Sequence, residues 1–117
     1  MGELVGSKRE WSLEAAREML SEVRQRTGVA VAAVDALSAE RNAPAPSAQE
    51  RQSIDTRIRT RVSRWVREME ALGVEPKGLW LIDFDNGCGC YCWRWPEDSL
   101  EYFHGYEEGF EGRSRIQ

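Results

Sequence analysis

Histidine and cysteine are scarce in this chain of 117 residues. The single histidine is His104, and the three cysteines all lie between Cys88 and Cys92. An odd number of clustered cysteines does not suit the disulfide framework of a small secreted protein, and it fits a reducing compartment. The sequence also lacks an apolar run of membrane-spanning length, and its first ten residues, MGELVGSKRE, lack the hydrophobic segment of a signal peptide. We therefore expect a cytoplasmic protein with no membrane partner.

Basic side chains are scarce in the second part of the chain. Residues 1–72 contain 12 basic and 11 acidic side chains, whereas residues 73–117 contain 4 basic and 9 acidic ones, so the net charges are +1 and −5. A row formed by Arg57, Arg61 and Arg64 could meet phosphate groups, but such a row is more typical of a solvated helix face. Because the acidic second part repels nucleic acid, we expect no nucleic-acid partner.

Small and apolar side chains recur at alternating spacings of three and four residues along the first third of the chain. The row consists of Leu13, Ala16, Leu20, Val23, Thr27, Ala30, Val34 and Leu37. This spacing predicts a helix with a coiled-coil-like seam, and Ser12 is suited to cap its first turn. Gly28 interrupts the row at a cost of about 1 kcal/mol relative to alanine, so the sequence allows a kink or a break there. Pro44 and Pro46 end the helix.

A second helix is predicted directly after these prolines. Ser47 and Glu50 have the spacing of a capping box, and Gly73 is placed to end the helix in the left-handed conformation. The apolar row between them consists of Ile54, Ile58, Val62, Trp65, Met69 and Leu72. Two helices of similar length joined by a short loop pack antiparallel. The sequence therefore predicts a helical hairpin over residues 11–73.

The apolar period changes to that of strands after residue 73. Within residues 74–105 the pattern predicts three strands, at 79–84, 88–95 and 99–104. Asn86-Gly87 favours a tight hairpin turn because both residues tolerate positive φ, and Pro96 marks the next turn. The glycine-containing tail, residues 106–117, is expected to be irregular. We predict a single α+β domain over 1–117, in which the long antiparallel hairpin packs on a small three-stranded antiparallel β-meander.

The cysteines alternate with other residues along the second predicted strand. Side chains two residues apart share a face of a strand, so Cys88, Cys90 and Cys92 should point the same way. A turn at Pro96 that pairs residues 95 and 99 would place Cys90 opposite His104 and bring an imidazole to the same face. Three sulfurs and an imidazole are the ligand types of a Cys₃His zinc site, although a straight strand splays its thiols apart. The alternative is that the cysteines are small buried apolar residues.

Large aromatic side chains occupy the opposite face in the same register. They are Tyr91, Trp93, Trp95 and Phe103. We expect this face to pack on the helical hairpin rather than to stack nucleic-acid bases. The face that carries Arg94 and His104 would then be covered by the tail alone.

His104 allows three interpretations. It could bind a metal, it could act as a general base, or it could make structural hydrogen bonds. Nearby carboxylates in the sequence are Glu101, Glu107, Glu108 and Glu111. Cys92 and His104 are a conceivable nucleophile and base, but their orientation does not follow from the sequence.

Four segments together resemble a known family. They are WSLEAAREMLSEVR, ALGVEPKGLWLIDFD, CWRWPE and EYFHGYEEGFEGR. In this order, over residues 11–115, the chain resembles the uncharacterised bacterial family named domain of unknown function 2203. The resemblance implies a helical hairpin followed by a β-rich part, and it implies no established activity. The matching positions are Asp83, Phe84, Cys92, Trp93, Arg94, Glu97, His104, Gly109, Phe110, Gly112 and Arg113.

The chain departs from the family pattern before the Cys-Trp-Arg motif. The family usually has a longer segment there, whereas DNGCGC is compact and adds Cys88 and Cys90. Pro96 replaces a glycine, and Phe103 replaces a tryptophan. A three-cysteine metal site would therefore be peculiar to this chain.

The residues shared with the family have a physical interpretation of their own. Arg94 and Arg113 could pair with Asp83, Glu97 or Glu108, and His104 could join the network. Such a network would either latch the tail to the sheet or, if open to solvent, bind a small anion. The candidate residues of this site or latch are Asp83, Cys92, Trp93, Arg94, Glu97, His104, Phe110 and Arg113.

Two functional hypotheses follow. The leading one is a non-enzymatic cytoplasmic accessory module whose helical hairpin docks a protein partner or a second copy of the chain, because Val29, Val31 and Val66 would stay exposed. It predicts no cofactor. The competing one is a metal or small-ligand site, open to catalysis, with zinc or another transition metal as its cofactor. Its residues would be Cys90, Cys92, Arg94, Glu97, His104 and Arg113.

Overall fold

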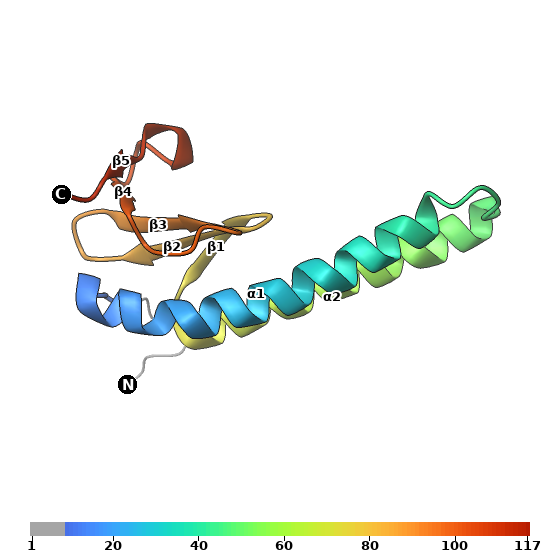
Figure 1. Cartoon of the computed structure of the whole chain (residues 1–117), viewed down its shortest axis with the longest axis horizontal. Coiled ribbons are helices and arrows are strands. Elements are labelled where there is room, and N and C mark those ends of the chain that lie inside the picture. The colour runs from blue at the N-terminus through green and yellow to red at the C-terminus, as the bar shows by residue number, and fades with distance from the viewer. Residues whose placement is uncertain (1–8) are drawn as a thin grey trace.

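The computed structural model of the chain describes residues 9–117 and confirms an α+β fold with a helical hairpin (Figure 1). The elements in chain order are α1 (Leu13–Arg41), α2 (Ala48–Leu72), β1 (Glu75–Gly78), β2 (Leu81–Asp85), β3 (Cys90–Arg94), β4 (Tyr102–His104), a 3₁₀ helix (Phe110–Gly112) and β5 (Ser114–Arg115). The expectation that the N-terminal segment is no signal peptide falls largely on residues 1–8, outside the described part. Neither α1 nor α2 carries an apolar stretch that would let it cross a membrane.

Both helices begin and end where their capping residues predict. The Ser12 hydroxyl accepts the N–H of Ala15 at 3.0 Å, and Ser47 and Glu50 form the reciprocal capping box of α2. Gly73 ends α2 with a φ of 87°, a left-handed conformation that favours glycine.

The kink that the sequence allows at Gly28 does not form, and α1 is continuous from Leu13 to Arg41. A Cβ at Gly28 would lie 2.9 Å from Cη2 of Trp95. The absence of a side chain at Gly28 therefore lets the ring of Trp95, which directly follows β3, pack closely against α1.

Ion pairs join the two helices near the loop that connects them. The Arg41 guanidinium binds both carboxylate oxygens of Asp55, at 2.5 and 3.2 Å, and Arg57 lies 3.7 Å from Glu40. Of the basic row on α2, Arg57 is thus paired with an acid of α1, whereas Arg64 pairs with Glu68 of its own helix.

The three predicted strands are present as β2, β3 and β4, but the sheet contains five strands. All pairs are antiparallel, and the order β1-β2-β3-β4-β5 follows the chain. β1 was not predicted because a proline such as Pro76 is unusual within a strand, and the pairing of β1 with β2 shifts register next to it. β5 was not predicted because two residues are too few for a visible period. The predicted irregular tail is therefore ordered in part.

The aromatic face of the sheet packs on the hairpin as predicted, with one exception. Trp93 is fully buried in the core, and Tyr91 and Trp95 are half-buried against it, whereas Phe103 is 42% exposed. The reason is that β4 and β5 lie farther from the helices than the first three strands (Figure 1).

Trp11 closes the other side of this core. Its backbone N–H donates to the Asp85 carbonyl at 2.7 Å, its indole N–H donates to the Gly73 carbonyl at 3.0 Å, and its ring packs edge-on against Phe84. The end of the hairpin that holds the α1–α2 loop projects beyond the sheet (Figure 1).

Candidate functional site

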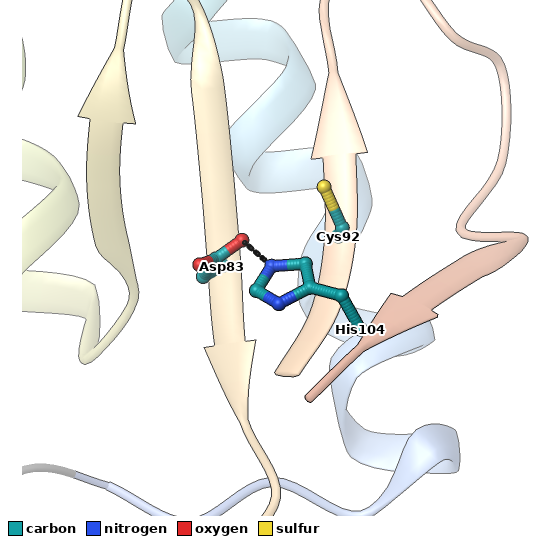
Figure 2. Close-up of side chains that lie close together, drawn as sticks. All are labelled: Asp83, Cys92 and His104. Atoms are coloured by element: carbon teal, nitrogen blue, oxygen red, sulfur yellow. Dashed lines mark hydrogen bonds and ion pairs between the residues drawn. The ribbon is translucent and has the colours of Figure 1, made fainter. Parts of the chain in front are cut away.

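Three neighbouring strands bring a carboxylate, a thiol and an imidazole together on the face of the sheet that points away from the hairpin. Asp83 on β2 lies directly opposite Cys92 on β3, and His104 on β4 lies opposite Cys90. Alternation along β2 sends Ile82 and Phe84 into the core, so Asp83 points the other way. The potential ligand atoms of Asp83, Cys92 and His104 all lie within 4.8 Å of one another (Figure 2).

These three side chains are almost completely removed from solvent. Their exposed fractions are 5% for Asp83, 1% for Cys92 and 4% for His104. Buried polar groups require partners, so the contacts of each one define what the cluster can do.

Both ring nitrogens of His104 face oxygen atoms. Nδ1 lies 2.7 Å from the carbonyl oxygen of Gly105, and Nε2 lies 3.1 Å from Oδ1 of Asp83. A carbonyl oxygen only accepts, so Nδ1 carries a proton and donates. A carboxylate is also an acceptor, so a proton on the ring or on the carboxyl group satisfies the contact between Nε2 and Asp83. A metal ion that replaced this proton would be bound by both groups.

The surroundings of His104 favour a positive charge at this point. Burial alone would disfavour the charged ring, but the hydrogen bonds to Gly105 and Asp83 outweigh it and raise the His104 pKa above its usual value. The surroundings thus favour a protonated ring beside Asp83, and a metal ion at this point has to displace that proton.

The geometry does not orient Cys92 and His104 as a nucleophile and base. Both ring nitrogens are directed at Gly105 and Asp83, so no nitrogen is aimed at the thiol. Burial raises the Cys92 pKa to about 11 with help from the Asp83 carboxylate, while the Arg113 guanidinium opposes the shift. Without a metal ion, this thiol stays protonated at neutral pH.

A second polar pair lies beside the cluster and ties the tail to the sheet. The Arg113 guanidinium donates to both oxygens of Glu97, at 3.1 and 2.6 Å, and stacks on the rings of Tyr102 and Phe110. Glu97 also accepts the backbone N–H of Arg94 at 2.9 Å. Arg113–Glu97 is one of the pairs that the sequence allows, and we call it the latch because it joins the tail to the turn between β3 and β4.

A cavity of about 660 Å³ opens above the cluster, between the sheet and the tail. Its lining residues are Glu75, Lys77, Leu81, Asp83, Asp85, Cys90, Cys92, His104, Tyr106, Gly109 and Phe110. The Tyr106 hydroxyl donates to Asp85 at 2.7 Å, which raises the Tyr106 pKa to about 12, and Lys77 lies 3.3 Å from Glu75. The cavity therefore joins a buried polar cluster to solvent.

The family model for "Uncharacterized conserved protein (DUF2203)" matches residues 9–116. The chain belongs to this family. Comparison with curated proteins and with solved structures gives no match. The family description carries no activity.

The structure separates the sequence-predicted metal ligands of this DUF2203 chain. Cys92 and His104 belong to the cluster, and Cys90 is buried along the same strand and lines the cavity. Cys88 is exposed in the turn between β2 and β3, where its N–H binds the Asn86 side chain. Asp83, in place of Cys88 and Cys90, is the third potential ligand of the cluster.

The other candidate residues divide between the cavity and its surroundings. Phe110 lines the cavity, and Glu97 and Arg113 form the latch beside it. Trp93 belongs to the core on the opposite face, where its indole N–H binds the Glu97 carbonyl. The Arg94 side chain is exposed, with its guanidinium 5.6 Å from the Phe110 ring centre.

Sequence reasoning included Asp83 and Cys92 among the candidates but considered Asp83 as a partner of arginine, and it missed Asp85 and Tyr106 as lining residues. A signal was present in the segment LIDFD, because two carboxylates alternate with residues that must be buried. Acids in a strand of this kind lie on the second face, and both prove to be buried.

Proposed function

We propose that this DUF2203 chain binds one divalent transition-metal ion, with zinc the best fit, through Asp83, Cys92 and His104. The observation that carries the proposal is the convergence of a carboxylate oxygen, a thiol sulfur and an imidazole nitrogen from three buried residues, whose potential ligand atoms all lie within 4.8 Å of one another. Nitrogen and oxygen ligands about 2.0–2.2 Å from a tetrahedral zinc ion lie about 3.3–3.6 Å apart, somewhat more than the 3.1 Å between Nε2 of His104 and Oδ1 of Asp83.

The donor types support a zinc-like ion over magnesium or calcium. Thiolate and imidazole are preferred by zinc and its neighbours in the transition series, whereas magnesium and calcium take oxygen ligands. The hydrogen bond from Nδ1 of His104 to the Gly105 carbonyl supports it further, because metal-binding histidines usually donate their other N–H to such an acceptor.

Metal content and affinity test the proposal directly. Untagged protein purified without chelator is loaded with zinc, and the bound metal is measured by plasma mass spectrometry and by competition with a chromophoric chelator. We expect one equivalent of zinc, with affinity at least about tenfold lower in Cys92→Ala and Asp83→Asn. The matched control is Cys88→Ala, which changes an exposed cysteine outside the cluster and should keep full affinity.

The competing explanation of the cluster is a structural imidazolium. In that case the protein contains no zinc above background, and His104→Ala lowers the free energy of unfolding by about 1–3 kcal/mol because a buried carboxylate loses its partner. That result would overturn the metal proposal.

A second candidate function is self-association through the projecting end of the hairpin. Residues 29–39, VAVAAVDALSA, carry a single charge, Asp35. Ala30 and Leu37 are buried toward α2, yet Val29 is 60% exposed, and Ala32 and Ala36 on the same side are also exposed. An exposed helix face that carries valine and alanine side chains is suited to be covered, and an identical helix of a second copy would cover this one.

Light scattering coupled to size exclusion, over a range of protein concentrations, tests this second function. We expect a dimer that Ala36→Glu converts to a monomer, while Thr60→Glu, an exposed position on α2, leaves the mass unchanged. A wild-type monomer at all concentrations would remove self-association and leave a different protein as the only partner for this surface.

A further inference from the structure

We infer that the metal ion held by Asp83, Cys92 and His104 keeps an open coordination position that faces the cavity and binds a small external Lewis base with an apolar body. This inference rests on the proposed metal site. It adds that the site is a ligand-binding centre rather than a closed structural one.

The three donors reach the ion from the same side. They project from β2, β3 and β4, three adjacent strands, onto one face of the sheet. The sheet backbone and the core lie beneath them, so every remaining coordination position points away from the sheet. A structural zinc site fills its fourth position with protein, whereas a reactive or ligand-binding site leaves it open.

Three residues near the cluster, Asp85, Glu97 and Cys90, are not placed to supply a fourth protein ligand. Asp85 accepts hydrogen bonds from the Tyr106 hydroxyl and from the Gly87 N–H, at 2.7 and 2.9 Å. Both oxygens of Glu97 are bound by Arg113. The Cys90 sulfur lies outside the group of ligand atoms that lie within 4.8 Å of one another.

The volume above the cluster is larger than coordinated water requires. A water molecule occupies about 30 Å³, and pockets for small molecules are typically about 300–1,000 Å³. The cavity of about 660 Å³ falls in the second range. It therefore has room for a molecule of several ring atoms bound to the metal.

The lining decides the chemical class of that molecule. A divalent ion with the Asp83 carboxylate and the Cys92 thiolate is neutral, and the adjacent Asp85 carboxylate and the paired Glu75 and Lys77 leave the cavity without excess positive charge. Multivalent anions such as phosphate are therefore disfavoured. Leu81 and Phe110 provide an apolar wall. The fitting ligand is a neutral or monoanionic donor, such as an azole nitrogen or a thiol, that carries an apolar group.

Substitution with cobalt(II) reports both the protein ligands of the metal ion and its open coordination position in one experiment. Cobalt(II) bound to a thiolate gives a charge-transfer band and visible d–d bands that change when a ligand joins the metal. Full-length cobalt protein is titrated with 4-phenylimidazole, imidazole and inorganic phosphate. We expect both imidazoles to give saturable changes in the d–d bands. 4-Phenylimidazole should bind at least about tenfold more tightly than imidazole because its phenyl ring is buried. Phosphate should cause no change.

A pair of leucine variants tests whether the cavity is the binding space. Leu81→Trp fills the lining and should weaken 4-phenylimidazole at least about tenfold while the unliganded cobalt spectrum stays unchanged. The control is Leu79→Trp, because Leu79 is 60% exposed and does not line the cavity. If Leu81→Trp fails to fold, Phe110→Ala supplies the second measurement, since loss of this wall should reduce the preference for 4-phenylimidazole over imidazole.

The outcomes distinguish a failure of the open coordination position from a failure of the proposed metal site. The absence of a thiolate-to-cobalt band would refute the metal site itself. If the thiolate-to-cobalt band is present but none of the three probes changes the d–d bands, the metal centre is closed. That result would overturn the open coordination position alone. Tighter binding of phosphate than of 4-phenylimidazole would overturn the ligand class.

Discussion

The indole nitrogen of Trp65 donates a hydrogen bond of 2.9 Å to the hydroxyl of Thr27 across the interior of the helical hairpin. Both residues are buried, Thr27 completely and Trp65 to 99%. This bond lets a threonine occupy a seam position where an aliphatic side chain would otherwise be expected, because it satisfies the one polar atom of the largest core residue.

Replacement of Thr27 should therefore show the cost of leaving that indole unpaired. Thr27→Val keeps the shape and has a similar helix propensity, and we expect it to lower the free energy of unfolding by about 1–3 kcal/mol. The control Thr27→Ser keeps the hydroxyl and loses one methyl group, for about 1 kcal/mol. Urea denaturation measures both, and equal stability of Thr27→Val and wild type would contradict the role of the bond.

The latch between Arg113 and Glu97 should depend on the shape of the guanidinium as well as its charge. Lysine cannot bind both carboxylate oxygens at once, so Arg113→Lys should lower the free energy of unfolding by about 1–2 kcal/mol and should expose the tail to limited proteolysis. The exposed pair of Arg115 with Glu101 provides the control. Arg115→Lys should change stability by less than about 0.5 kcal/mol, and similar effects at the two positions would argue against a specific latch.

The three cysteines should differ sharply in reactivity. Cys88 is exposed, whereas Cys90 and Cys92 are buried with pKa values raised to about 12 and about 11. In the metal-free protein at pH 8 the thiolate fraction of the buried pair is about 0.1% or less, so iodoacetamide should label Cys88 alone in the native state and all three in concentrated urea. Peptide mass spectrometry locates the label. Rapid native labelling of Cys92 would show that its thiol is reactive despite its burial.

Alanine at position 28 should destabilise the protein although it favours helix formation. Its Cβ would overlap Trp95, so we expect Gly28→Ala to lower the free energy of unfolding by about 1 kcal/mol net of the gain in propensity. In a Trp95→Leu background the overlap disappears, and the same change should raise stability. Thermal denaturation of the four proteins completes the cycle, and a stabilising effect in both backgrounds would show that Trp95 simply moves aside.

The pair of Arg41 and Asp55 should support the hairpin in a pH-dependent way. The Arg41 guanidinium holds the pKa of the Asp55 carboxyl below its usual range. Because the folded pKa is the lower one, the contribution is complete above the unfolded pKa of about 4 and is lost as the pH falls through the folded value.

Arg41→Gln should accordingly be less stable than wild type at pH 7, and the difference should shrink toward pH 2. In an Asp55→Asn background, used as the control, the pH-dependent part of the difference should vanish. Urea titrations at a series of pH values measure it, and a difference that grows on acidification would have the wrong sign for this pair.

Local chemistry made the helices and three strands predictable. Ser12, Ser47 and Gly73 act at the helix ends as their side chains or backbone dictate, and the apolar spacing between them gives the seam. β1 and β5 could not be predicted in the same way, because one contains a proline and the other has two residues. Their pairing comes from the neighbouring strands, which is a tertiary effect.

The site was predictable only in part, because its composition depends on the length of one turn. A two-residue turn at Asn86-Gly87 would place Asp83 opposite Cys90. The observed pairing of Asp85 with Cys90 makes the turn longer, with the Asn86 side chain accepting the N–H groups of Cys88 and Gly89. The shift of two residues keeps every side chain on its face but gives Asp83 a different partner, Cys92.

The sheet order has a consequence for the way the chain folds during synthesis. Because each strand pairs with the one made just before it, the sheet can add strands one at a time as they leave the ribosome, and such short-range pairing favours rapid folding. Contacts between α1 and the sheet are long-range instead, and the first of them is that of Trp11, whose partners Gly73 and Asp85 appear more than 60 residues later. The first core aromatic residue to be synthesised therefore has to wait for the second strand, and its docking marks the moment when the hairpin and the sheet become one folding unit.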